Sequence, residues 1–325
     1  MKSKAVAPSD TVHLVDCTLR EGAQAPGIKF SAETTVEIAK ALDGAGVAIV
    51  EAGHPCASDA EFERVERLVR LGLRAKVLAH ARAVERDISA VARTGADAVG
   101  IFVGVNHISQ TARLRRDERE ILSMIDSSVR LARSHDLTVR LTIEDASRTE
   151  FAMLRRAYEV ALNAGADRLC FADSVGVLSP VEVAAGIGEL RSAFPQTPLE
   201  VHFHDDRGLA MANTLSAIAA GATHVSCSVN GIGERCGITD TAALAANLAY
   251  ENIECGVRLS AVASLSGLVE RVTACGPDAR RPVTGRHAFS HTARLHVKAV
   301  ERDPNAYQWM DPADLGYPVA GGAGA

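Results

Sequence analysis

Short apolar segments alternate with amphipathic ones along most of the 325-residue chain, and this alternation restricts the fold more than any other feature. Eight runs rich in Val, Ile and Leu are separated by stretches with apolar residues at helical spacing. Repeated strand-helix units predict a parallel sheet, and eight of them close a TIM barrel. The expected strands are residues 12–17, 47–52, 76–80, 98–103, 138–143, 168–172, 199–204 and 224–229. We therefore predict an α/β fold, a (β/α)8 TIM barrel with a short C-terminal helical and lid extension.

Glycine precedes four of the expected strands, in the segments D-G-A-G, R-T-G-A, N-A-G-A and A-A-G-A. A left-handed glycine commonly ends a helix, so each segment marks a helix end before the next strand. This rhythm stops near residue 251. We predict a catalytic barrel domain over residues 1–252 and a C-terminal helical subdomain with a lid segment over residues 253–325, without a regulatory domain.

Composition narrows the class of protein. The net charge of -5 and a pI near 6.1 argue against a nucleic-acid partner held by a general positive field. The seven cysteines include no C-x-x-C pair and indicate reduced thiols. The N-terminus lacks the apolar run of a signal peptide, and no stretch reaches the roughly 20 apolar residues that span a bilayer. We expect a cytoplasmic protein with no membrane partner.

Two histidines at the end of the seventh expected strand give the strongest local signal of chemistry. His202 and His204 alternate in V-H-F-H, so a strand directs both rings to one face. In a TIM barrel such strand ends open on the active site. Two imidazoles and a carboxylate form a metal-binding set with open positions for substrate. The pair alone fits equally well one packed and one solvated histidine, so a third ligand has to be found.

The first and fifth expected strands bring further polar residues to the same end of the barrel. D-C-T-L-R-E-G places Asp16, Arg20 and Glu21 at the end of the first strand. In T-V-R-L-T-I-E, Arg140 and Glu144 alternate onto one face. Each cluster also has a purely structural interpretation. After the first strand, a buried carboxylate could form an ion pair with Arg20. On the fifth strand, Arg140 could form one with Glu144.

Three long motifs in this order resemble a known family. D-C-T-L-R-E-G-A-Q, H-x-H-D-D-x-G-L-A-x-A-N and N-G-I-G-E-R-C-G are similar to motifs of the DRE-TIM metallolyases, in their homocitrate and isopropylmalate synthase branch. The resemblance covers about residues 12–317. It implies an acyltransferase (EC 2.3.3.-) that condenses acetyl-CoA with a 2-oxo diacid chelated by a divalent metal, with 2-oxoglutarate as the leading acceptor and homocitrate as the product.

The resemblance also assigns roles to individual residues. It implies that Glu21, His202 and His204 bind the metal, and that Asp16 lies behind this set. Arg20 looks like the group that stabilises the alkoxide formed on attack. Arg140 and Thr142 match positions that hold the distal carboxylate of 2-oxoglutarate. The implied substrate-binding residues are Arg20, Gln24, His80, Arg140, Thr142 and Ser174, the last in place of the usual Thr.

A base must remove a methyl proton from acetyl-CoA, and the sequence offers three groups for this acid-base chemistry. His296 matches a histidine that relatives contribute from a neighbouring subunit, which implies a homodimer with exchanged C-terminal segments. Glu200 precedes His202 by two residues and shares its face. Tyr307 matches a lid tyrosine that serves as an acid or as an orienting donor.

The chain departs from the family pattern at a few positions. Arg294 and Leu295 stand where synthases usually carry Gly and Ile before the histidine matched by His296. Asp205 replaces the commoner Asn, a change shared by nitrogen-fixation homocitrate synthases. Thr239, which lysine-pathway enzymes share, weighs against a lyase. The chain ends soon after D-L-G-Y-P, so we expect no leucine-type feedback control.

Other interpretations stay open at this point. The same chemistry fits phosphonopyruvate, as in a 2-phosphonomethylmalate synthase, or oxaloacetate or another 2-oxo acid. An acyl-CoA lyase uses the same metal and barrel, and a barrel that binds metal without turnover is a third class. A set of two histidines and one carboxylate accepts Zn, Mn, Mg, Co or Fe, with geometry and availability deciding.

Overall fold

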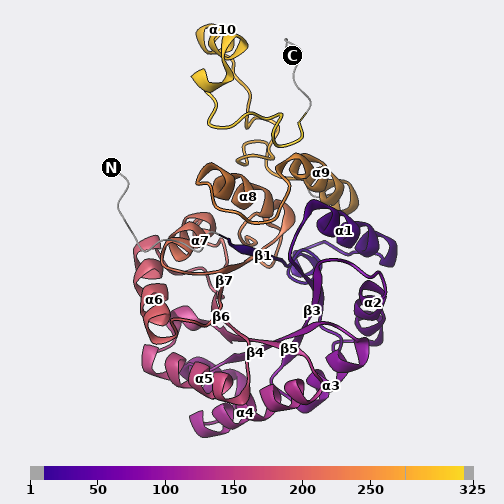
Figure 1. The fold of residues 1–325 in the computed structure, drawn as a ribbon, viewed down its shortest axis with the longest axis vertical. Coiled ribbons are helices and arrows are strands. Elements are labelled where there is room, and N and C mark those ends of the chain that lie inside the picture. Colours follow the sequence, from indigo (N-terminus) through magenta and orange to yellow (C-terminus); the bar gives the residue numbers. More distant parts are fainter. Residues whose placement is uncertain (1–10, 275, 318–325) are drawn as a thin grey trace.

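The computed structural model describes residues 11–274 and 276–317, and its centre is a closed barrel of parallel strands in sequence order (Figure 1). Every expected strand forms, within three residues of its predicted ends, and the (β/α)8 fold is confirmed. The strands are β1 (His13–Asp16), β2 (Ile49–Gly53), β3 (Lys76–Arg82), β4 (Ala98–Gly104), β5 (Thr138–Glu144), β6 (Arg168–Asp173), β7 (Leu199–Phe203) and β8 (His224–Cys227).

A ring of helices surrounds the strands (Figure 1). The four glycines of the repeat, Gly46, Gly95, Gly165 and Gly221, all have positive φ, between 76° and 109°, as a helix-ending glycine requires. The barrel helices are α1 (Ala32–Ala45), α2 (Asp59–Val69), α3 (Glu85–Thr94), α4 (Glu118–Ser134), α5 (Phe151–Ala164), α6 (Pro180–Ala193), α7 (Ala210–Ala219) and α8 (Thr241–Tyr250).

Successive side chains along a barrel strand point alternately outward, toward the helices, and inward, into the barrel. On β5, Leu141 and Ile143 pack outward into the apolar layer beneath the helices. Arg140 and Thr142, on the other face, are buried inside the barrel. A small apolar cluster that includes Val15, Cys17, Ile49 and Leu78 lies apart from the main core. The inward positions of β5 thus carry polar chemistry while the outward ones hold the sheet against its helices.

The C-terminal part continues beyond the barrel. Helix α9 (Val262–Thr273) lies beside α1, with an ion pair between Arg271 and Glu37. Helix α10 (Arg294–Arg302) stands apart, beyond α8 and α9 (Figure 1). We call residues 290–309 the arm, and none of its residues is buried. The predicted division at residue 252 falls just after α8, and it stays a prediction.

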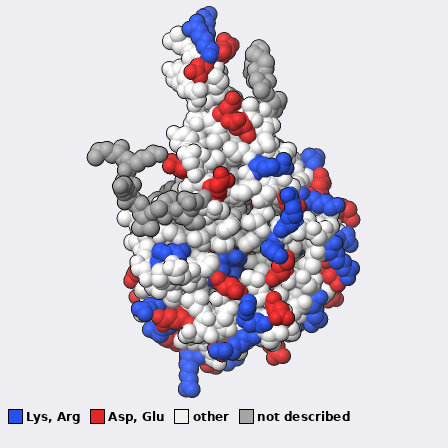
Figure 2. Space-filling model, in the orientation of Figure 1, with Lys and Arg blue, Asp and Glu red and all other residues white. Residues whose placement is uncertain are grey.

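The described residues show how the charges and the cysteines are distributed. Figure 2 shows acidic and basic side chains interspersed over the visible face of the barrel, without one dominant sign. The six described cysteines are free, and Cys275 lies outside the described residues, as do residues 1–10 and 318–325 of the two predicted domains. Across residues 11–274 and 276–317, no helix combines the length and apolarity that a membrane crossing requires.

Candidate metal centre and active site

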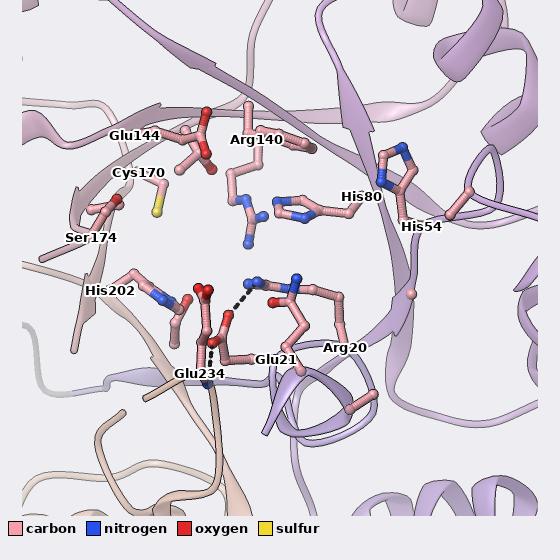
Figure 3. Close-up of a pocket in the computed structure, with 18 of the residues that line it drawn as sticks. Arg20, Glu21, His54, His80, Arg140, Glu144, Cys170, Ser174, His202 and Glu234 are labelled. Atoms are coloured by element: carbon pink, nitrogen blue, oxygen red, sulfur yellow. Dashed lines mark hydrogen bonds and ion pairs between the residues drawn. The ribbon is translucent and has the colours of Figure 1, made fainter. Parts of the chain in front are cut away.

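A cavity of about 400 Å³ opens at the carboxyl ends of the strands (Figure 3). Its position follows from the fold, since strand ends and the loops after them form the mouth of a TIM barrel. Nine of the residues predicted for the site line this one cavity: Arg20, Glu21, Gln24, His80, Arg140, Thr142, Ser174, His202 and His204. Residues on β3, β5 and β7, and residues that follow β1, β6 and β7, are therefore brought together as the motifs predicted.

Three donor groups converge at one side of the cavity. The Nε2 atoms of His202 and His204 are 3.3 Å apart, and Nε2 of His204 is 4.0 Å from Oε1 of Glu21. One donor atom from each of the three residues lies within 4.8 Å of the others. Two atoms that bind one zinc ion tetrahedrally, each at about 2.1 Å, lie about 3.4 Å apart, so the spacing of the two imidazoles suits a shared cation.

The charge states of these groups also suit a cation. Burial lowers the pKa of His202 to about 3, so its imidazole is neutral and carries a free lone pair at neutral pH. Burial likewise lowers the pKa of His204. Burial raises the pKa of Glu21, but Arg20 and the two histidines lower it further, and the net shift is downward. Two neutral imidazoles and one carboxylate fit a divalent metal without first losing protons.

An ion-pair network adjoins the metal donors through Arg20 and Glu21. Arg140 donates from Nη2 to Oε1 of Glu51 over 2.7 Å and from Nη1 to Oε1 of Glu200 over 2.8 Å. Arg20 donates to Oε2 of Glu51 over 2.7 Å and also pairs with Glu21. Arg140 therefore does not pair with Glu144, and that structural interpretation was wrong. Glu144 instead pairs with Arg113 at 3.1 Å.

Several donors along the cavity wall make no hydrogen bond within the described part of the chain. They are Nε2 of His80, Nε of Arg140 and Oγ1 of Thr142, all buried. Buried polar atoms usually find partners, so unpaired ones that face a cavity indicate a ligand-binding wall. Oγ of Ser174 accepts from the amide of Asp145 over 2.9 Å, which leaves its hydroxyl hydrogen to donate.

Glu200 does not line the cavity. It is fully buried, and its carboxylate is held by Arg140, by Arg168 at 2.7 Å and by the hydroxyl of Ser226 at 2.8 Å. Burial raises its pKa, but Arg140 and Arg168 lower it further, which makes it a poor proton acceptor. Its placement favours a role in holding Arg140 over the predicted role as a base.

The other two predicted acid-base residues lie on the arm, away from the cavity. His296 and Tyr307 stack on each other with ring centroids 3.9 Å apart. Neither lines the cavity of its own chain. Asp16 is also outside it, fully buried, and accepts from the amide of Thr18 and the hydroxyl of Thr241 at 2.9 Å each. Asp16 thus joins β1 to α8 behind the metal donors.

The sequence motifs did not single out two residues on or just after β2, His54 at the mouth and Glu51 in the buried network. His54 follows β2 and lines the cavity, and its Nε2 lies 2.7 Å from Oδ2 of Asp87 at the start of α3. The signal available was position, because G-H-P comes directly after an expected strand, where barrel enzymes carry functional groups. Glu51 lies within β2 and is fully buried, and strand periodicity does not predict its partners across the barrel, Arg20 and Arg140.

Fold and donor set together define a TIM barrel with a candidate metal site in its mouth. Residues 11–269 match the profile of the HMGL-like family, and residues 283–321 match a homocitrate synthase post-HMGL domain-like profile. The chain belongs to the HMGL-like family. The resemblance to the homocitrate synthase branch, drawn from the three motifs, is confirmed by these matches.

Two homocitrate synthases are similar in sequence to this chain over most of its length. A homocitrate synthase of Saccharolobus solfataricus is 40% identical over 310 residues, which cover 94% of this chain and 67% of that protein. A homocitrate synthase of Sulfurisphaera tokodaii is 39% identical over the same shares. The HMG-CoA lyase of Bacillus subtilis has a TM-score of 0.74 at 20% identity and covers 83% of this chain and 96% of its own. At that identity the likeness concerns the fold alone.

Proposed function

We propose that the protein condenses acetyl-CoA with a 2-oxo diacid, with 2-oxoglutarate as the leading acceptor, and then releases coenzyme A and homocitrate. The names of the relatives support this enzyme class and product. The observation that carries the proposal is the position of the metal donors opposite a wall of unpaired donors within one cavity. Such a cavity suits a molecule with an anionic group at each end.

Charge balance supports a dianionic acceptor. Arg20, Arg140 and Arg168 are paired with Glu21, Glu51 and Glu200, so the buried network is neutral by itself. A divalent cation at Glu21, His202 and His204 would then balance a diacid, and it would supply Lewis-acid polarisation of the keto group. The distal acid would accept hydrogen bonds from Thr142, His80 and Ser174, with Arg140 behind them.

Arg20 is placed to stabilise the charge that develops on the keto oxygen. Its guanidinium is held by Glu51 on one side and Glu21 on the other, so its direction is fixed before substrate binds. Burial lowers the pKa of Arg20, but Glu51 and Glu21 raise it further, and the group stays charged. A preorganised charge of this kind favours the transition state over the ground state. Gln24, on the same wall, can donate to the acceptor carboxylate.

The proposal keeps His296 as the base that removes the methyl proton and Tyr307 as its acid or orienting partner. Because both lie on the arm and not in the cavity of their own chain, they would act in the barrel of a second subunit, which requires a homodimer. The proposed metal is a divalent ion, which is zinc, manganese, magnesium or cobalt. A cytoplasmic location also stays a prediction.

The acceptor can be tested by measuring thiol release from acetyl-CoA with 2-oxoglutarate, oxaloacetate, phosphonopyruvate and the monoacid pyruvate. We expect 2-oxoglutarate to give the highest kcat/KM and pyruvate to be poorest, because it leaves the distal donors unpaired. A preference for pyruvate, or no thiol release with any acceptor, would contradict the proposal. Cleavage of a 3-hydroxy-3-methylacyl-CoA without a 2-oxo acid would favour a lyase.

Thr142 offers a matched pair of variants for the distal site. Thr142→Val removes the hydroxyl while keeping the shape, and Thr142→Ser keeps the hydroxyl. We expect Thr142→Val to raise the KM for 2-oxoglutarate about tenfold and to leave the KM for acetyl-CoA unchanged, since one hydrogen bond to a charged group contributes about 1.5 kcal/mol. Thr142→Ser should stay close to the wild type.

A further inference from the structure

His54 is held at the wall of the cavity mouth. Its side chain is 24% exposed, and it lies near His80 in the view of Figure 3, away from the metal donors. The ring of Phe102 packs edge-on against it, with centroids 5.9 Å apart, and also packs against His80. The imidazole is therefore fixed in place without being removed from the cavity.

A buried carboxylate orients this ring. Asp87 is fully buried, and it accepts from Nε and Nη2 of Arg82 over 2.8 and 2.9 Å while its Oδ2 lies 2.7 Å from Nε2 of His54. Burial raises the pKa of Asp87, but hydrogen bonds from Arg82, Cys56 and His54 lower it further, to well below its ordinary value. Asp87 is therefore ionised, and Arg82 holds it rigidly.

The ionised carboxylate determines the tautomer of His54. A carboxylate can only accept hydrogen bonds, so Nε2 of His54 carries the hydrogen and donates it to Asp87. The lone pair of a neutral ring then lies on Nδ1, which makes no hydrogen bond with the described residues. A carboxylate behind one ring nitrogen and a free lone pair on the other is the arrangement of a histidine general base.

The other histidines of the cavity and Glu144 have contacts different from those of His54. His202 and His204 face each other in the metal set. Nε2 of His80 lies 3.8 Å from Oε1 of Glu51, beyond hydrogen-bonding distance, and burial lowers the pKa of His80 well below the ordinary value. Glu144 pairs with Arg113. Of the described histidines that line the cavity, His54 is the one with a ring nitrogen within hydrogen-bonding distance of a carboxylate.

The proposed reaction has a second half that needs such a group. Condensation joins the acetyl carbon to the acceptor but leaves the thioester intact, so coenzyme A leaves only after water attacks. A cavity of about 400 Å³ admits the acceptor and the acyl end but not the rest of coenzyme A. The thioester must therefore lie toward the mouth, where His54 stands and the buried network does not reach.

We propose that His54, oriented by Asp87, is the general base for hydrolysis of the condensed acyl-CoA thioester, an inference that rests on the proposed function. Nδ1 takes a proton from water as the water oxygen bonds to the thioester carbon. The carbon–sulfur bond then breaks, and His54 returns the proton to the leaving thiolate. The products are a free carboxylic acid and coenzyme A, with no other reactant needed.

The test uses the full-length protein, acetyl-CoA and 2-oxoglutarate, with acid-quenched samples separated by chromatography. Three species are measured: acetyl-CoA, the condensed thioester and free coenzyme A. In His54→Gln we expect consumption of acetyl-CoA to continue in the first turnover while the condensed thioester accumulates and free coenzyme A forms about 100-fold more slowly, the usual contribution of a general base. Asp87→Asn, which disturbs the orientation of the ring, should accumulate the same thioester.

Two comparisons keep this test decisive. His135→Gln replaces an exposed histidine at the end of α4 and should behave as the wild type. In His54→Ala, free imidazole in solution should restore coenzyme A release, which a merely structural loss would not allow. Wild-type coenzyme A release by His54→Gln, or equal loss of both half-reactions without any thioester and without imidazole rescue, would overturn the inference. Failure of the wild type to consume acetyl-CoA would instead refute the proposed function.

Discussion

The barrel mouth and the arm carry histidines in opposite settings. His202 lies on β7 and His204 directly follows it, and both are buried. They lie close to the carboxylate of Glu21, which comes from the segment after β1. His296 lies on a nine-residue helix with no buried residue, and Leu295 beside it is 81% exposed. One chain is enough to assemble the first group. Among the described residues, the ring of His296 stacks on Tyr307 of the same arm, so under the proposed function a second chain would have to give it a site.

The largest expected effect comes from removing one of the metal donors. His202→Asn should remove metal binding and lower coenzyme A release about 1000-fold or more, because a Lewis acid contributes several kcal/mol to the transition state. Metal content of the purified protein and thiol release are the two measurements. His107→Asn, at an exposed histidine after β4, is the matched control. A His202→Asn protein with wild-type metal content would break the assignment of the site.

A mixing experiment tests the assignment of the arm. Glu21→Gln and His296→Ala should each be inactive alone. If each arm serves the other barrel, a mixed dimer holds one intact site, so random exchange of subunits should restore about a quarter of wild-type activity. The measurement is thiol release before and after subunits are exchanged by mild denaturation and refolding.

The outcome of mixing separates two arrangements of the arm. If His296 instead folds back onto its own barrel, a mixed dimer has no intact site and activity stays at background. Full activity of His296→Ala alone would remove this residue from the mechanism. In either case the metal content of His296→Ala should equal that of the wild type, since no arm residue belongs to the donor set.

The same contrast explains what the sequence could predict. His202 and His204 were predictable because a strand imposes a period of two and a barrel imposes the open end. The partners of Arg140 were not, since the two glutamates that hold it stand on β2 and β7, and strand periodicity gives the face of a residue but not its cross-barrel neighbour. Arg140 was therefore paired with Glu144 in one interpretation, and the structure corrected it.

The residues that escaped prediction share a physical feature. His54 and Asp87 are 33 positions apart, and their contact depends on how the loop after β2 lies against the start of α3. Loop geometry of this kind follows from packing and not from any local period. The arm is a stronger case, because His296 does not line the cavity of its own chain, and no local pattern says where such a residue acts.

A smaller effect extends the contrast to His224, a half-buried histidine. His224 starts β8, at the end of the barrel opposite the metal donors, and burial together with Arg168 lowers its pKa to about 3. The folded state keeps this ring neutral, whereas the unfolded chain binds a proton below about pH 6.5. The unfolded state therefore binds more protons in this range, and the stability that His224 contributes above pH 6.5 is lost as the pH falls toward 3.

Urea unfolding at pH 7.5 and pH 5.0 measures this loss. One depressed histidine accounts for about 2 kcal/mol over that interval, at 1.36 kcal/mol for each pH unit below the unfolded pKa. His224→Gln should therefore lose about 2 kcal/mol less than the wild type between the two pH values, whatever its stability at pH 7.5. The exposed His135→Gln should show the wild-type difference, because its ring stays in solvent when the chain folds. An equal loss in wild type and His224→Gln would mean that water reaches His224 in the folded barrel, and the contrast between barrel and arm histidines would then hold only at the mouth.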